Sequence, residues 1–162
     1  MSLYAESSAI LAWLLDEPAG TFVRETLAET EIVVASDLTL IECDRVIHRA
    51  TALGELTEAE AADRRAHLTT AATHWHVLHI GPEVVDRARQ PFPGDPIRTL
   101  DAIHLASVLV ARSSVAGLEL LSLDDRIRGV GKRLGLALWP EDPLQAHPGE
   151  SRCRARVGPH AH

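Results

Sequence analysis

The chain has few of the residues that build covalent or metal-linked frameworks. Its only cysteines, Cys43 and Cys153, lie 110 positions apart with no second pair beside them. This count supports neither a disulfide framework nor a zinc site built from cysteine. The 162 residues are therefore expected to depend on an ordinary hydrophobic core, and a chain of this length buries enough surface to form one.

Long apolar runs are also absent. Near the N-terminus the longest one spans Ala9 to Leu15, far short of the roughly 20 residues that cross a bilayer. Residues 2–8 ahead of it contain one acid and no base, which is not the pattern of a secretory signal. We therefore expect a cytoplasmic protein that does not enter the membrane.

A surplus of positive charge is missing as well. Sixteen Lys and Arg residues stand against 23 Asp and Glu, which gives a formal net charge of −7. Proteins that bind nucleic acid without sequence preference usually carry a basic surplus that displaces counterions from the phosphates. If this acidic chain acts on nucleic acid, it needs another way to hold a phosphate group.

The hydrophobic pattern alternates between short strand-like runs and longer helical ones. This alternation predicts an α/β fold with a mostly parallel central sheet flanked by helices. Strands are expected at residues 3–5, 31–35, 75–80, 118–123 and 136–139. Helices are expected to begin at Ser7 or Ser8, at Pro18, at Ser36 or Asp37, after the capping-box pair Thr57 and Glu60, at Pro82, after a cap at Thr99, and at Asp125.

The same pattern predicts one domain followed by a tail. Residues 1–140 contain all the expected strands and helices. Residues 141–162 combine proline and glycine with Arg and His and show no apolar period. We therefore expect a mobile C-terminal tail.

Four carboxylates lie where packing would favour an apolar residue. Glu6 and Asp124 follow the first and fourth expected strands, Glu42 lies within a hydrophobic helix, and Asp101 lies in the first turn of the most apolar helix. Each alone has a structural explanation, such as a helix cap, an ion pair with a nearby arginine or a favourable helix dipole. Consecutive parallel strands end at one edge of a sheet, however, so the four acids are expected to meet there.

Several carboxylates at close range repel one another and resist ionising together. A bound divalent cation removes that conflict, and oxygen ligands of this kind favour Mg²⁺ or Mn²⁺. Such an ion also bridges an acidic site to a phosphodiester and activates water for attack. The acids therefore predict a metal site that acts on a phosphate ester.

Four short motifs around these acids carry a family resemblance. They are YAESSA at residues 4–9, SDLTLIE at 36–42, LDAIHLA at 100–106, and LSLD at 121–124 followed by Arg126 and Leu134-Gly135-Leu136. In this order they resemble the PIN-domain nucleases, and most closely the VapC-type ribonuclease toxins of bacterial toxin–antitoxin pairs. The resemblance covers about residues 1 to 139 and leaves the tail outside.

This resemblance implies a three-layer PIN-like fold and a divalent-metal-dependent endoribonuclease that cleaves single-stranded RNA. It implies that the protein is neutralised by an antitoxin, and that it forms a homodimer. The catalytic acids would be Glu6, Glu42, Asp101 and Asp124, with Glu6, Asp101 and Asp124 as the metal ligands. Ser8 and Ser122 are polar neighbours of the acids, and with Arg98 and Arg126 they are the candidate RNA contacts.

One departure from the family pattern leaves a second function open. The family's first acid is usually Asp, whereas Glu6 is longer by one methylene, or roughly 1.5 Å. Either the site has adapted to the longer side chain, or metal affinity is weakened and the chain is a PIN-like binding module. A third alternative, a phosphoacceptor receiver domain, ranks last because the single lysine, Lys132, lies inside the last expected helix.

Other polar residues carry weaker indications. His74 and His76 have strand spacing that places both on one face, but no third metal ligand accompanies them, so a surface position is favoured. His104 follows Asp101 by three positions and can approach the site, although a core histidine bonded to backbone is favoured. For Arg128, as for the two other arginines near the acids, phosphate contact and simple solvation are equally open.

Overall fold

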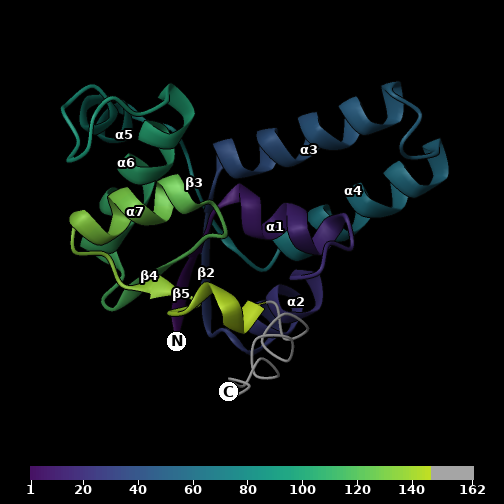
Figure 1. The fold of residues 1–162 in the computed structure, drawn as a ribbon, viewed down its shortest axis with the longest axis horizontal. Helices are drawn as coiled ribbons and strands as arrows, with labels where there is room; N and C mark the ends of the chain where they lie inside the picture. The colour runs from purple at the N-terminus through teal and green to yellow at the C-terminus, as the bar shows by residue number, and fades with distance from the viewer. Residues whose placement is uncertain (147–162) are drawn as a thin grey trace, which may run out of the picture.

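Five strands form one parallel sheet at the centre of the molecule (Figure 1). The computed structural model describes residues 1–146, and the strands are ordered β3-β2-β1-β4-β5. Each neighbouring pair is parallel, which confirms the prediction of a mostly parallel sheet. The strands are β1 (Ser2–Ala5), β2 (Ile32–Ser36), β3 (His76–Leu78), β4 (Leu118–Leu121) and β5 (Leu138–Trp139).

Helices cover both faces of this sheet (Figure 1). On one side of the sheet lie α1 (Ser7–Leu14), α2 (Gly20–Glu29), α3 (Asp37–Ala52) and α4 (Glu58–Ala72). On the other side lie α5 (Pro82–Ala88), α6 (Thr99–Ser114) and α7 (Asp125–Arg133).

The central strand shows how the sequence divides the two cores. Successive side chains of a strand point to opposite faces of the sheet. Leu3 therefore packs with Ile10 of α1 and Ile47 of α3, whereas Tyr4 packs with Leu105 of α6. All of these side chains are fully buried, and the predicted three-layer α/β arrangement is confirmed.

Two of the helix starts follow the capping residues that the sequence indicates. Thr57 accepts a hydrogen bond from the backbone of Glu60, while the Glu60 carboxylate accepts one from the backbone of Thr57, which completes the expected capping box of α4. The Ser36 hydroxyl accepts from the backbone N–H of Thr39 and caps α3. These caps supply acceptors for N–H groups that a helix start leaves unpaired.

Other helix starts differ from the expectation. Ser7 and Ser8 do not cap α1. Glu6 is the N-cap instead: its carboxylate accepts from the Ser8 N–H, and both serines lie within the helix. Thr99 is the first residue of α6 rather than its cap, and Arg98 before it makes no side-chain capping bond.

The second helix begins at Gly20, two residues after its expected start at Pro18. A Cβ atom at Gly20 would lie 2.5 Å from the carbonyl oxygen of Ala12. Glycine is therefore what allows α2 to pack directly against the backbone of α1.

The segment after the sheet begins with ordered structure. Residues Pro143–Ala146 form a 3-10 helix, and Ala146 is fully buried against Ala12 and Ala19. The expected boundary at residue 140 thus precedes a packed turn, and the rest of the expected tail, residues 147–162, lies outside the described residues. Within residues 1–146 no helix has the length and hydrophobicity needed to cross a membrane.

Candidate active site

The carboxyl edge of the sheet is where the functional side chains gather. Ala5 at the end of β1 pairs with Leu121 at the end of β4, so Glu6 and Ser122 come next on adjacent strands. The α1, α3 and α7 helices follow β1, β2 and β4 directly, and their first turns therefore start from this edge. The edge thus combines strand-end acids with helix N-termini, which favour negative charge.

Glu6 is almost completely buried, and four donors surround its carboxylate. Its Oε1 accepts from the Ser7 hydroxyl at 2.8 Å and from the Ser8 backbone N–H at 3.1 Å. Its Oε2 accepts from the Ser122 hydroxyl at 2.8 Å and from the Ser8 hydroxyl. Glu6 therefore joins β1, α1 and the end of β4 in one hydrogen-bonded group.

Glu42 meets Glu6 through shared partners. The Nε2 atom of His104 lies 2.5 Å from Glu42 Oε2 and 3.7 Å from Glu6 Oε1. With Glu42 ionised, Nε2 must carry a hydrogen and donate it to the carboxylate. His104 is buried, as predicted for a core histidine, but its partners are side chains rather than the expected backbone. Its spacing of three from Asp101 on one helix face was the signal for a site residue.

The electrostatics of this pair favour an ionised Glu42. Burial alone would raise the pKa of Glu42, but hydrogen bonds from His104 and Ser7 outweigh it and hold the pKa below its usual value. Ser7 has a single hydroxyl hydrogen, yet its Oγ lies 2.8 Å from Glu6 Oε1 and 2.6 Å from Glu42 Oε2. One hydrogen between two carboxylates leaves acceptor capacity that a cation can use.

Asp101 and Asp124 form a neighbouring pair linked by an arginine. The Arg126 guanidinium lies 3.0 Å from Asp124 Oδ2 through Nη2 and 3.8 Å from Asp101 Oδ2 through Nε. Burial and the nearby Asp124 raise the pKa of Asp101. Burial would raise the pKa of Asp124 as well, but backbone N–H groups of Arg126 and Ile127 at the start of α7 hold it below its usual value.

These contacts define two groups among the expected site residues. Glu6, Glu42 and His104 each offer a ligand atom, and the three atoms lie within 4.8 Å of one another. Asp101 and Asp124 stay outside that set and share Arg126 instead. Asp124 still affects the pKa of both Glu42 and Asp101, so the two groups interact electrostatically.

The residues expected to contact substrate are also split between the Glu6–Glu42–His104 group and the Asp101–Asp124 pair. Ser8 and Ser122 bond to Glu6 and lie inside the first group. Arg98 lies near Asp101, whose pKa it lowers against the larger effects of burial and Asp124. The carboxylate oxygens of Glu6 and Glu42 share the single Ser7 hydrogen and keep free acceptor capacity, which suits a hard divalent cation, so the residues present fit such an ion.

Comparison with known families identifies the fold around this site. The family model described as PIN domain matches residues 3–133. The chain belongs to the PIN domain family. This membership confirms the resemblance on which the expected site was based and removes the receiver-domain alternative.

Solved structures share the fold of this PIN domain at low sequence identity. VapC20 of Mycobacterium tuberculosis, described as a toxin that cleaves the sarcin-ricin loop, has a TM-score of 0.58 at 14% identity, over 80% of this chain and 95% of that one. VapBC2 of Rickettsia felis, bound to a promoter DNA fragment, has a TM-score of 0.58 at 11% identity, over 85% and 97%. A toxin–antitoxin complex from Klebsiella pneumoniae has a TM-score of 0.52 at 17% identity, over 76% and 87%. No curated protein sequence matches the chain.

Arg128 has a role in the PIN domain that neither alternative anticipated. It is 6% exposed, and its guanidinium donates to the carbonyl oxygens of Ser122 at 2.9 Å and Pro140 at 2.7 Å. Longer contacts reach Trp139 and Glu141. Arg128 therefore neither contacts phosphate nor lies on the surface; it joins the site end of β4 to the chain after β5.

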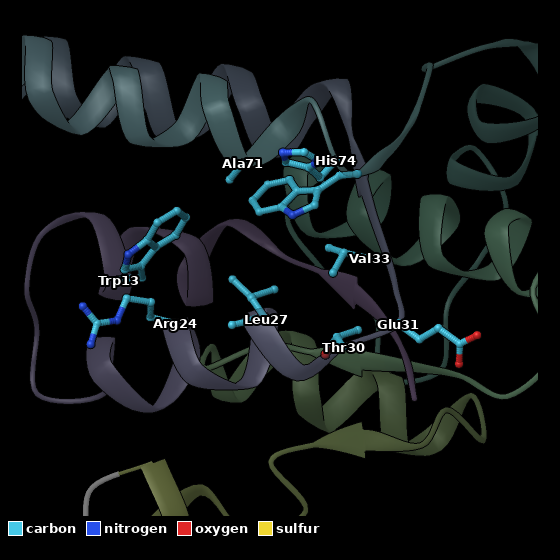
Figure 2. Close-up of a pocket in the computed structure, with 10 residues that line it drawn as sticks. Trp13, Arg24, Leu27, Thr30, Glu31, Val33, Ala71 and His74 are labelled. Carbon is cyan, nitrogen blue, oxygen red and sulfur yellow. The ribbon is translucent and has the colours of Figure 1, made fainter.

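A pocket of about 450 Å³ lies away from the acids (Figure 2). Trp13 of α1 and Arg24 of α2 line one side, His74 lines the opposite side, and Leu27 lies between them. His74 and His76 are both exposed, which confirms the favoured surface position. The group of possible metal ligands found within residues 1–146 contains neither of them. With Glu31 as its only acid, this pocket lacks the ligand set of the acidic edge.

Proposed function

We propose that this PIN domain is a divalent-metal-dependent endoribonuclease that cleaves single-stranded RNA and acts as the toxin of a toxin–antitoxin pair. The single observation that carries the proposal is the cluster of Glu6, Glu42 and His104 beside the Asp101 and Asp124 pair. Ionised carboxylates gathered at one sheet edge repel one another, and a bound cation removes that repulsion. Membership of the PIN domain family supports nuclease chemistry at this edge.

Glu6, Asp101 and Asp124 are the proposed ligands of Mg²⁺ or Mn²⁺. Such an ion, when bound, lowers the pKa of water and neutralises charge on a phosphodiester. Within the chain, Ser7, Ser8 and Ser122 orient the Glu6 carboxylate through their hydroxyls. These serines therefore fix one ligand before substrate arrives, which preorganises the site.

Glu42 is the proposed acceptor for the proton of the attacking water. Its lowered pKa keeps it ionised at neutral pH, and its carboxylate is partly exposed to solvent. His104 acts as a positioning residue, because its Nε2–H donates to Glu42 and fixes the carboxylate orientation. Arg98 and Arg126 are the proposed contacts to RNA phosphate.

Toxin function also requires an inhibitor and a defined assembly. The similar folds include VapBC2 and a toxin–antitoxin complex, which supports a protein antitoxin as partner. The acidic edge is suited to an arginine or lysine of that partner, since charge-assisted hydrogen bonds to carboxylates are strong. We further propose that the protein forms a homodimer, which sedimentation at high concentration tests.

Cleavage of a labelled single-stranded RNA with Mg²⁺, Mn²⁺ or EDTA tests the nuclease. Asp101→Asn is expected to abolish cleavage, whereas Asp86→Asn, an equal change at an exposed site on α5, is expected to leave it unchanged. Cleavage that continues at the same rate in excess EDTA contradicts the metal mechanism. Loss of growth on expression, restored by the neighbouring gene product, tests the toxin role.

A PIN-like binding module with weakened catalysis is the second candidate. The observation that favours it is the crowding of Glu6, whose carboxylate accepts from Ser8 and Ser122 and shares the Ser7 hydrogen with Glu42. A metal ligated by Glu6 competes with these donors. Under this alternative the wild-type protein is inactive, and Glu6→Asp, the usual family residue, creates activity.

A further inference from the structure

A cleft of about 350 Å³ opens beside Asp101, between α7 and the loop that precedes α6. Its lining includes three arginines, Arg98 from the loop and Arg126 and Arg133 from α7. Gly129 lies between the two helix arginines on the same helix face, because the spacings are three and four residues. Asp101 and Asp125 also line the cleft, so its charged side chains leave a positive surplus in a protein with a net charge of −7.

Two of the three guanidinium groups have no carboxylate partner among the described residues. Arg126 is held by Asp101 and Asp124. Arg98 and Arg133 are exposed, and no carboxylate of the described residues lies within ion-pair distance of either. Unpaired arginines at a concave surface are suited to phosphate, since the guanidinium fork binds two phosphate oxygens at once.

Two glycines give the cleft its shape. A Cβ atom at Gly129 would meet no atom within 4 Å, so this position faces open space inside the cleft. Gly94 has a φ of +91°, and a Cβ atom there would collide with the Arg133 guanidinium. The glycine thus allows the loop to pass close to Arg133 without displacing its side chain from the cleft.

We propose that this cleft binds the backbone phosphates of single-stranded RNA next to the scissile bond, with Arg98 and Arg133 as the principal contacts. The proposal rests on the proposed nuclease function, and it assigns the RNA path on the α7 side of the acids. It also explains how an acidic protein holds a polyanion, because the positive charge of the arginines is concentrated where the RNA leaves the acidic edge of the sheet.

Two readouts test the cleft, and Lys132 provides a matched control. Lys132 is exposed in the same last turn of α7 as Arg133 but does not line the cleft. The first readout is binding of a short fluorescein-labelled single-stranded RNA in EDTA over a series of salt concentrations. The second is kcat and KM for cleavage of the same RNA with Mg²⁺ or Mn²⁺.

Arg98→Gln and Arg133→Gln are each expected to reduce the slope of log affinity against log salt by about 0.7, the value for one phosphate contact on a single strand. Each is expected to raise KM with little change in kcat, since the contact forms equally in ground and transition states. Lys132→Gln is expected to match the wild type in both readouts.

Gly129 gives a test that removes no arginine. Gly129→Ala is expected to behave as wild type, whereas Gly129→Glu places a negative group in the open cleft and raises KM more than either arginine variant. The cleft proposal is overturned if wild type cleaves RNA but Arg133→Gln and Gly129→Glu match Lys132→Gln. If wild-type protein neither binds nor cleaves RNA, the proposed function fails and the cleft proposal fails with it.

Discussion

Arg126 and Arg128 lie two positions apart on α7, and the structure predicts opposite consequences for their replacement by methionine. The Arg128 guanidinium is buried and donates at 2.9 Å and 2.7 Å to two backbone carbonyls. Hydrogen bonds from a charged group contribute about 1.5–3 kcal/mol each, and burial of the cation offsets part of this. We expect Arg128→Met to lower the free energy of unfolding by about 3 kcal/mol.

Arg126 is 53% exposed, and its contacts are ion pairs with Asp101 and Asp124. Exposed ion pairs contribute about 0–1 kcal/mol and weaken in salt. Arg126→Met is therefore expected to change stability little while it impairs RNA binding. For a domain of this size, 1 kcal/mol corresponds to about 2–4 °C in Tm, so the Arg128 variant is expected to melt roughly 6–12 °C lower.

Urea unfolding followed by circular dichroism at pH 7, with EDTA present, measures both changes without a contribution from bound metal. The Arg128 loss is expected to persist in high salt, whereas the smaller Arg126 effect is expected to disappear. Arg128→Lys keeps the charge but loses the two-pronged guanidinium, so its free energy of unfolding is expected to lie between those of the wild type and Arg128→Met. An Arg128→Met protein as stable as Arg126→Met would refute the assignment of Arg128 as a structural clamp.

Three further predictions concern the acids. The pKa of Asp101 is raised in the folded protein, so its ionised form opposes folding. Asp101→Asn is therefore expected to raise the Tm of the metal-free protein at pH 7. No gain is expected below about pH 4, because Asp101 is then protonated in both the folded and the unfolded protein. The pKa of Glu42 is lower in the folded than in the unfolded protein, so ionised Glu42 stabilises the fold at pH values above its unfolded-state pKa. This stabilisation is lost as the pH falls through its folded-state pKa. The Tm of Glu42→Gln is therefore expected to depend less on pH in that acid range than the Tm of the wild type. Asp124→Ala removes the cap of α7 and is expected to lower the free energy of unfolding in urea by about 1 kcal/mol. Asp124→Asn keeps an equally good cap, so we expect a smaller loss of stability together with the same loss of activity as in Asp124→Ala.

The layers of the fold were accessible from the sequence because hydrophobic periodicity reports directly which side of an element is buried. The ends of elements were less accessible. The last strand, expected over residues 136–139, is only Leu138–Trp139, because it pairs with just Leu120 and Leu121 of β4. The partner strand β4 extends back to Leu118, so the point at which the two strands come close enough to pair is a tertiary property.

Part of the candidate site could also be predicted from the sequence, because the hydrophobic pattern locates the strand ends. Strand-end acids follow from topology, so the strand pattern alone was enough to bring Glu6 and Asp124 to one edge of the sheet. The bond between His104 and Glu42 depends on how α6 and α3 cross, which no local pattern encodes. Arg128 shows the opposite limit, because an arginine is expected at the surface while this side chain turns inward.

Two helices of this domain begin on acids of the candidate site: Glu6 caps α1 and Asp124 caps α7. Natural selection for folding and selection for chemistry therefore act on some of the same atoms. A descendant that no longer cleaves RNA would still be penalised for losing Glu6 or Asp124. Retention of those residues among related sequences is thus weak evidence of activity, and Asp101, which caps no helix, is the position where decay would first become visible.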